Sequence, residues 1–164
     1  MSVGTGVGMT AREVMRKKVL TVREDMQVLD AVRMMLKKKV SGAPVVDDQY
    51  RLIGMLSEKN CIQALLRAVA ERLPSSAVAD VMQTDVETIA ETADLLTIAH
   101  TFVTKPLRRL PVVAADGTLL GQISRRDLLT SALQVWDEAP SRQAAVLYLS
   151  ATGRKTPFGG PGRR

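Results

Sequence analysis

One short motif occurs twice in the chain and carries side chains that can bind a phosphorylated sugar. Residues 54–60 read GMLSEKN, and residues 121–127 read GQISRRD. In each copy a short apolar run ends at a serine, and a helix-forming run follows. The N-terminus of a helix presents unpaired N–H groups and a partial positive charge, so it favours phosphate. The hydroxyls of Ser57 and Ser124 can donate to a phosphate oxygen, and the Asp127 carboxylate can accept hydrogen bonds from both hydroxyls of a ribose.

Basic residues in the second copy also favour an anion. Arg125 and Arg126 fall in the first turn of the second helix, where positive charge opposes the helix dipole. A bound anion would compensate for that placement. Capping gives an alternative explanation, because a serine followed three residues later by Asn60 or Asp127 is typical of a helix N-terminus. The occurrence of the pattern in both copies favours binding, and capping stays the alternative.

The motif lies in a longer internal repeat. A shift of 67 positions aligns about residues 14–69 with 81–136 without a gap, and 14 of the 56 pairs are identical. The identities include turn-forming and strand residues, such as the PVV of 44–46 and of 111–113. A period above 50 residues exceeds the usual solenoid unit. The chain is therefore expected to contain two copies of one small domain.

Each copy is predicted to have the order β-α-β-β-α. Apolar residues at i, i+3 and i+4 indicate helices, and short apolar runs bounded by turn residues indicate strands. Asp116–Gly117 between two apolar runs is a strong hairpin signal. The predicted strands are 19–22, 43–47, 52–57, 86–89, 110–114 and 118–124, and the predicted helices are 28–38, 95–104 and one that follows each motif serine.

The fold class expected from this plan is α/β (α+β), with two repeats packed through their sheets about a pseudo-twofold axis. A unit of about 55 residues has little core of its own, so the two copies should pack together and leave clefts where their sheets meet. The predicted divisions are a flexible arm (1–10), repeat 1 (11–72), a linker (73–77), repeat 2 (78–138), a C-terminal helix (139–152) and a disordered basic tail (153–164).

The duplicated pattern V-M, V-x-T, P-V-V and L-x-G-x-x-S-x-x-[ND] resembles the CBS domain, and two tandem copies resemble a CBS pair, or Bateman module. The resemblance covers about Ala11 to Trp136. It implies a regulatory module that binds an adenosine compound (AMP, ADP, ATP or S-adenosylmethionine) as a ligand, requires no cofactor and catalyses nothing. It also implies a homodimer and a separate regulated protein.

The resemblance also implies roles for individual residues. Asp127 matches the acid that binds ribose, and Asn60 takes its place in repeat 1. Ser57 and Ser124 match the hydroxyl on the phosphate side, and threonines on the first strands match residues beside the adenine. The implied ligand-binding residues are Thr21, Ser41, Gly42, Ala43, Pro44, Ser57, Lys59, Asn60, Val86, Thr88, Arg108, Arg109, Leu110, Pro111, Ser124, Arg125, Arg126 and Asp127.

The two implied sites are not equivalent. In the family, a site often takes its ribose acid and its phosphate-facing segment from opposite repeats. Asp127 would then face Ser41–Gly42, which brings no charge, and Asn60 would face Arg108–Arg109. Neither cleft would combine every favourable feature. Asp127 and Ser124 are expected to form the better adenosine site, and the Arg108–Arg109 side to prefer more phosphates.

Other reactive side chains are assigned structural roles. The chain has no phosphate loop of the G-x-x-x-x-G-K-[ST] type. His100 is the only histidine and has no partner cluster in sequence, which argues against a metal site or a catalytic triad. Cys61 is expected to be an inert thiol. The run Lys37–Lys39 complements the dipole at a helix C-terminus and is expected to be a solvated end.

Composition favours an intracellular protein with anionic partners. The net charge is +6, but part of the excess lies in the Gly/Pro-rich tail. A single cysteine excludes an internal disulfide and fits a reducing cytoplasm. No apolar run reaches the roughly 18 to 20 residues of a membrane span. Two alternatives to a nucleotide sensor stay open: a structural dimerisation module with ligand-free clefts, and a protein that binds nucleic acid through its basic tail.

Overall fold

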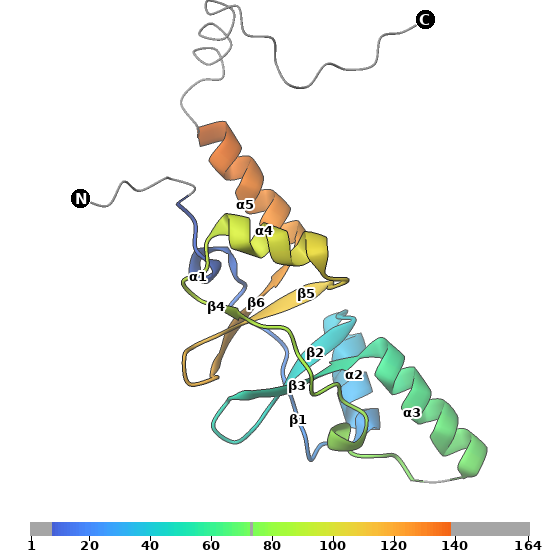
Figure 1. Cartoon of the computed structure of the whole chain (residues 1–164). Helices are drawn as coiled ribbons and strands as arrows, with labels where there is room; N and C mark the ends of the chain where they lie inside the picture. Colours follow the sequence, from blue (N-terminus) through green and yellow to red (C-terminus); the bar gives the residue numbers. More distant parts are fainter. Residues whose placement is uncertain (1–7, 73, 139–164) are drawn as a thin grey trace, which may run out of the picture.

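The structure, a computed structural model, describes residues 8–72 and 74–138, which form two repeats of the same architecture (Figure 1). In the first repeat β1 (Val22–Arg23) pairs in parallel with β2 (Gly42–Val46), which pairs antiparallel with β3 (Leu52–Ser57). In the second repeat β4 (Ile89–Ala90), β5 (Arg109–Val113) and β6 (Leu119–Ser124) repeat this order and these directions. The expected mixed α/β class is confirmed.

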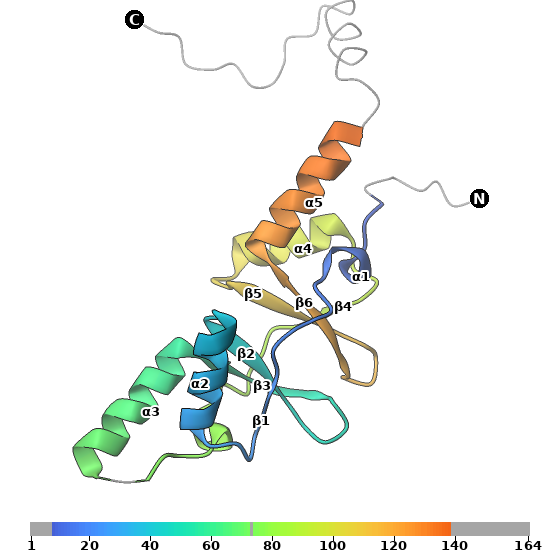
Figure 2. The same cartoon turned by 180° about the vertical axis from the view of Figure 1, so that it is seen from behind.

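Two helices cover each sheet. These are α2 (Val28–Lys38) and α3 (Glu58–Glu71) in the first repeat, and α4 (Leu95–Thr104) and α5 (Arg125–Glu138) in the second. Each helix turns an apolar face inward; α4, for example, buries Leu95, Ile98 and Phe102. Figures 1 and 2 show the sheets meeting at the centre of the molecule and the helix pairs lying outside. Among the residues described, no helix has the length and apolar character needed to cross a bilayer.

The predicted bounds of α2 and α4 are confirmed, whereas the first strand of each repeat is shorter than predicted. Strand β1 begins at Val22, not Val19, because only Val22 and Arg23 pair with β2. The preceding residues serve another purpose. Arg16 forms a bridge with Gln122 of the second repeat, so the chain crosses between the repeats before it enters β1.

The two repeats exchange their first segments. Helix α1 (Ala11–Val14), which was not predicted, packs in the second repeat, where the Ala11 N–H donates to the Ala93 carbonyl at 2.8 Å. In the same way Val78, at the start of a 3₁₀ turn, packs in the first core and donates to the Met26 carbonyl at 2.8 Å. Each core therefore contains residues from both halves of the sequence.

A pseudo-twofold axis passes between the β2–β3 and β5–β6 hairpins. Arg51 bridges to Thr118, its own equivalent under the shift of 67 positions. On either side, the Leu52 N–H donates to the Gly117 carbonyl at 3.1 Å and the Leu119 N–H donates to the Tyr50 carbonyl at 3.0 Å. Gly117 has a φ of 86°, as expected from the Asp-Gly turn. These contacts join the two sheets into one unit.

Candidate functional site

Two cavities lie where the repeats meet. The larger, the Asp127 cavity, has a volume of about 520 Å³. The smaller, the Ser57 cavity, has a volume of about 270 Å³. The first is lined by Arg16, Lys18, Val19, Leu20, Lys38, Lys39, Val40, Gly42, Arg109, Gln122, Ser124, Arg126 and Asp127. The second is lined by Ser41, Gly42, Met55, Leu56, Ser57, Gln83, Val86, Glu87, Pro106, Leu107, Arg108, Arg109 and Pro111.

The cavities are related by the internal repeat but differ in chemistry. Most lining residues of one are the 67-position equivalents of those in the other, such as Val19 and Val86. The residue differences between the copies change the polarity of the lining, because Gln122 corresponds to Met55 and Lys39 corresponds to Pro106. The Asp127 cavity is therefore the more polar of the two.

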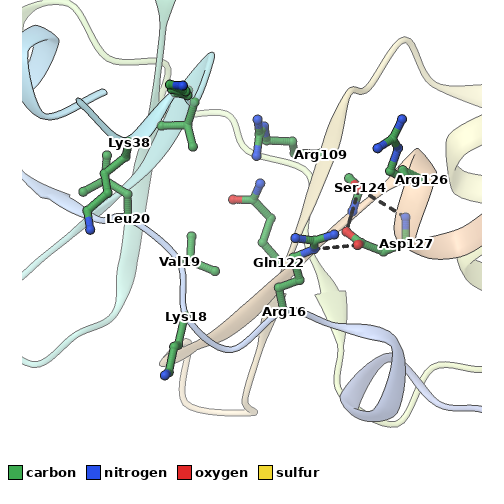
Figure 3. A pocket seen from close by; sticks show the side chains of 13 residues that line it. Arg16, Lys18, Val19, Leu20, Lys38, Arg109, Gln122, Ser124, Arg126 and Asp127 are labelled. Carbon is green, nitrogen blue, oxygen red and sulfur yellow. Dashed lines mark hydrogen bonds and ion pairs between the residues drawn. The ribbon is translucent and has the colours of Figure 1, made fainter. Parts of the chain in front are cut away.

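Asp127 is held at the N-terminus of α5 by a reciprocal cap. Its Oδ2 accepts from the Ser124 N–H at 2.9 Å and from the Ser124 hydroxyl, while the Asp127 N–H donates back to Ser124 Oγ at 3.2 Å. Its Oδ1 accepts from Arg16 Nε at 2.6 Å (Figure 3). The side chain of Asp127 is 10 % exposed and that of Arg16 is 70 % exposed.

The electrostatic environment keeps Asp127 ionised. Burial by itself would raise the pKa of the carboxyl, but the hydrogen bonds from Ser124 and Arg16 outweigh it and hold the pKa below its ordinary value. A carboxylate in this state is a strong acceptor for the hydroxyls of a sugar. The capping explanation and the binding explanation thus describe the same side chain, since one oxygen caps the helix and the other faces Arg16.

Asn60, the counterpart of Asp127 in repeat 1, makes the same cap but does not line the equivalent cavity. Asn60 Oδ1 accepts from the Ser57 N–H at 3.1 Å, and the Asn60 N–H donates to Ser57 Oγ at 3.2 Å. Ser57 lines the Ser57 cavity, whereas Asn60 instead lines a separate cavity of about 160 Å³ with Arg67 and Asp80. The expectation that Asn60 shares a cleft with Arg108 and Arg109 is therefore wrong.

Basic side chains from both repeats surround the Asp127 cavity. Figure 3 shows Lys38 on the side opposite Asp127, with Arg109 between them and Arg126 beside Ser124. Gly42 of the uncharged Ser41–Gly42 segment lines this cavity, and Arg109, which was expected on the side of the other cleft, lines both cavities. Its Nη2 lies 3.5 Å from Ser41 Oγ.

The end of α2 explains why lysines reach this cavity. Lys39 follows the last helical residue with a φ of 54°, a left-handed conformation that ends the helix and turns the chain towards β2. The Val40 N–H donates to the Met35 carbonyl at 3.1 Å in this turn. Lys38 and Lys39 are exposed, as expected for a solvated end, but they also line the cavity.

The predicted site residues are distributed between and beyond the two cavities. Gly42, Arg109, Ser124, Arg126 and Asp127 line the larger one, and Ser41, Gly42, Ser57, Val86, Arg108, Arg109 and Pro111 line the smaller one. Neither cavity is lined by Thr21, Ala43, Pro44, Lys59, Asn60, Thr88, Leu110 or Arg125. Ala43, Pro44 and Leu110 are buried strand residues, and Thr21 and Thr88 precede β1 and β4 instead of lying on them.

Several lining residues were missed by the sequence prediction. Arg16 and Lys18 belong to the crossing segment, which the sequence does not distinguish from an ordinary loop. Gln122 was hidden inside the recurring motif, although its replacement by Met55 in the other copy marks it as different. A comparison of the two copies for changes in polarity would have found it.

Other reactive groups lie outside these cavities. Cys61 is buried, and burial raises the pKa of its thiol, in keeping with the expected inert role. His100 is exposed on α4. No group of three or more His, Cys, Asp or Glu side chains in residues 8–72 and 74–138 could hold a metal ion. The predicted C-terminal helix and basic tail lie outside the described residues.

The paired sheets, the exchanged segments and the clefts at the junction define a tandem-repeat ligand-binding module. Comparison with known families makes this specific: the family model described as "CBS domain" matches residues 11–67 and 78–133. The chain belongs to the CBS domain family and contains two CBS domains in tandem.

Three proteins illustrate what this chain is similar to. The chain is 35 % identical over 118 residues to the uncharacterized protein MJ1225 of Methanocaldococcus jannaschii, covering 72 % of the chain and 41 % of the relative. It is 30 % identical to CBSX2, from Arabidopsis thaliana, solved in complex with AMP, with a TM-score of 0.69 and coverage of 78 % of the chain and 98 % of that structure. It is 31 % identical over 119 residues to the inosine-5'-monophosphate dehydrogenase of M. jannaschii, but spans only 23 % of that enzyme and 73 % of this chain.

Proposed function

We propose that the chain is a regulatory module that binds an adenine nucleotide in the Asp127 cavity and catalyses no reaction. The observation that carries the proposal is an ionised carboxylate beside a serine and a helix N-terminus, in a basic cavity between two CBS domains. Its volume of about 520 Å³ lies within the usual range for small-molecule pockets. The solved complex of CBSX2 with AMP supports the same ligand class.

The geometry suggests how the ligand is held. Asp127 accepts from the ribose hydroxyls once the exposed Arg16 side chain moves aside. Val19, Leu20 and Val40 offer apolar surface for the base. The first N–H groups of α5 would donate to phosphate, joined by the Ser124 hydroxyl once it gives up its hydrogen bond to Asp127 Oδ2.

Thermal denaturation with AMP, ADP, ATP and S-adenosylmethionine tests the proposal. A ligand present at about 100 times its Kd stabilises the native state by about 2.7 kcal/mol, so the Tm of the protein should rise by several degrees. Asp127→Ala should abolish most of this rise. Asn60→Ala removes the equivalent cap outside the cavity and serves as the matched control. The absence of a Tm shift with all four compounds would contradict the proposal.

We also propose that the chain forms a homodimer through its helices. Large exposed apolar side chains occur in pairs 67 positions apart: Leu29 and Leu96, Leu36 and Val103, Ile62 and Leu129, Leu66 and Leu133, and Val69 and Trp136. Two equivalent apolar faces suit a symmetric partner. A nucleotide that prefers one dimer arrangement would then shift the population and pass a signal to a regulated protein.

Light scattering after size-exclusion chromatography tests the dimer. Leu66→Glu with Leu133→Glu should give monomers, because it buries charge in the contact. Gln63→Glu with Thr130→Glu adds the same charge at exposed polar positions on the same two helices and should leave the mass unchanged. A dimer that binds none of the four compounds would favour the second candidate, a structural dimerisation module. Salt-sensitive RNA or DNA binding that is lost on deleting residues 153–164 would favour the nucleic-acid alternative.

A further inference from the structure

The Asp127 cavity concentrates positive charge, most of which is not ion-paired within the described residues. Six basic residues line it, and Asp127 is the only acidic one. Arg16 pairs with Asp127. The other five are Lys18, Lys38, Lys39, Arg109 and Arg126, and none of them forms an ion pair with a carboxylate within the described part of the chain.

This excess is local and does not reflect a generally basic protein. Five of the 23 basic residues, but none of the 17 acidic residues, lie beyond Glu138. Basic and acidic residues therefore almost balance in the part of the chain that forms the two repeats. The Ser57 cavity shows this balance, since Arg108 and Arg109 are accompanied there by Glu87 and by mostly apolar side chains.

Five unpaired cations around one cavity repel one another unless an anion binds. A concave site lined by one sign of charge focuses the potential into the cavity. The free energy gained on binding should therefore increase with the negative charge of the ligand. A ligand that carries net positive charge should be disfavoured.

We infer that the Asp127 cavity selects its nucleotide by phosphate charge, binding adenosine triphosphate more tightly than the monophosphate and S-adenosylmethionine most weakly. The sulfonium and ammonium groups of S-adenosylmethionine outnumber its carboxylate, which accounts for its place at the end of the series. The inference rests on the proposed function and adds its selectivity. It also moves the expected preference for more phosphates from the Arg108–Arg109 side to the Asp127 cavity.

Titration calorimetry on the full chain in EDTA tests the selectivity, with ATP, ADP, AMP, S-adenosylmethionine and inorganic tripolyphosphate as probes. Affinity should rise from AMP through ADP to ATP, with ATP binding at least about tenfold more tightly than AMP. The ratio of the two Kd values should shrink as salt screens the cations.

Adjacent residues provide matched variants. In the first turn of α5, Arg126 lines the cavity and Arg125 does not. In the last turn of α2, Lys38 lines the cavity and Lys37 does not. Arg126→Gln and Lys38→Gln should each reduce the ratio between the Kd values for AMP and ATP. Arg125→Gln and Lys37→Gln each remove one positive charge outside the cavity and should leave the ratio between the two Kd values unchanged.

The outcomes separate the inference from the proposed function. Equal Kd values for ATP and AMP, or equal effects of Arg125→Gln and Arg126→Gln, would overturn the charge selection and leave adenine-nucleotide binding intact. Tripolyphosphate binding that Arg126→Gln weakens, without binding of any adenosine compound, would support the selection and overturn the adenosine assignment. Binding of neither class would overturn both.

Discussion

The two carboxylate oxygens of Asp127 have different partners. One oxygen holds the N-terminus of α5 through Ser124, and the other accepts from the exposed Arg16 side chain in the cavity. Burial alone would raise the pKa of a carboxyl group in a cleft, but the hydrogen-bond donors of the cap keep Asp127 charged. The local capping motif therefore keeps the carboxylate charged, as the proposed binding of a ribose requires.

Asp127→Asn tests this electrostatic role by installing the residue that repeat 1 has at the equivalent position. Asn60 shows that an amide keeps the cap, so the variant should fold while losing the ion pair with Arg16, worth less than about 1 kcal/mol, and the charge-assisted part of the bonds from Ser124. Because the folded-state pKa of Asp127 is lowered, its charge stabilises the protein above the ordinary value of 3.8, and this contribution is lost as the pH falls through the folded-state value.

Urea denaturation at neutral and acidic pH measures the effect. The difference in free energy of unfolding between the wild type and Asp127→Asn should be largest near neutrality, should begin to fall near pH 3.8 and should vanish only below the folded-state pKa of Asp127. A difference that persists unchanged in acid would show that the carboxylate does not act through its charge.

Gln122 is a second polar residue of the cavity, and the burial of its amide lowers the stability of the protein. It is 5 % exposed, and its Oε1 is buried without a hydrogen-bond partner. A buried unsatisfied carbonyl costs about 1 to 3 kcal/mol. Gln122→Met installs the residue of the other copy, Met55, and should raise the free energy of unfolding by about 1 kcal/mol without ligand. The same variant should reduce the Tm shift with nucleotide if the amide contacts the ligand, and unchanged values in both measurements would contradict a role for Gln122.

At the scale of the elements, the two segments that cross to the other repeat decide where the cavity residues lie. One carries Arg16, which bridges to Gln122, and the other carries Gln83, which bridges to Met55. A Cβ at Gly121 would stand 2.7 Å from the Arg16 carbonyl oxygen, and a Cβ at Gly54 would stand 3.0 Å from the Gln83 carbonyl oxygen. Both neighbours are backbone atoms, so they cannot move without shifting the segment that carries them. The absence of a side chain at these two positions lets each crossing segment lie against the sheet of the other repeat.

Gly121→Ala should therefore destabilise the protein by about 1 to 3 kcal/mol and displace Arg16 from Asp127. Gly54→Ala should destabilise it comparably but leave the Asp127 cavity intact. Denaturant midpoints and nucleotide Kd values for both variants check the expectation, with Gly8→Ala as the control, since nothing lies within 4 Å of a Cβ there. Equal nucleotide affinity in all three variants would show that the crossing segment does not position the site.

At the scale of the whole molecule, the exchanged segments lead us to expect that the two repeats unfold as one cooperative unit. Ala11 and Val14 complete the core of the second repeat, and Val78 completes that of the first. Damage to either core should therefore unfold both. Gly42 and Arg109 line both cavities, so the two cavities share part of their walls.

Leu56→Ala tests this cooperativity. Leu56 is fully buried in the first repeat, and its truncation should cost about 2 to 5 kcal/mol. The only tryptophan, Trp136, reports from α5 of the second repeat. Its fluorescence midpoint in urea should fall by as much as the far-UV circular dichroism midpoint. A fluorescence midpoint that stays at the wild-type value would show that the repeats unfold independently.

The sequence by itself determined the local features of this protein. The shift of 67 positions established the duplication, hydrophobic periodicity placed α2 and α4 at their observed bounds, and the recurring motif located Ser124 and Asp127 at the start of a helix. These features depend on residues close together in the chain, so local propensity and spacing suffice to predict them.

Only the tertiary structure decided which distant side chains meet Asp127. Arg16 and Lys38 reach its cavity because a crossing segment and a helix end from the first repeat lie against the second. Asn60, at the same motif position as Asp127, makes the same cap but lines a separate cavity. The physical reason is that the packing of two sheets about an axis depends on contacts across the interface, and no periodicity within either repeat encodes them.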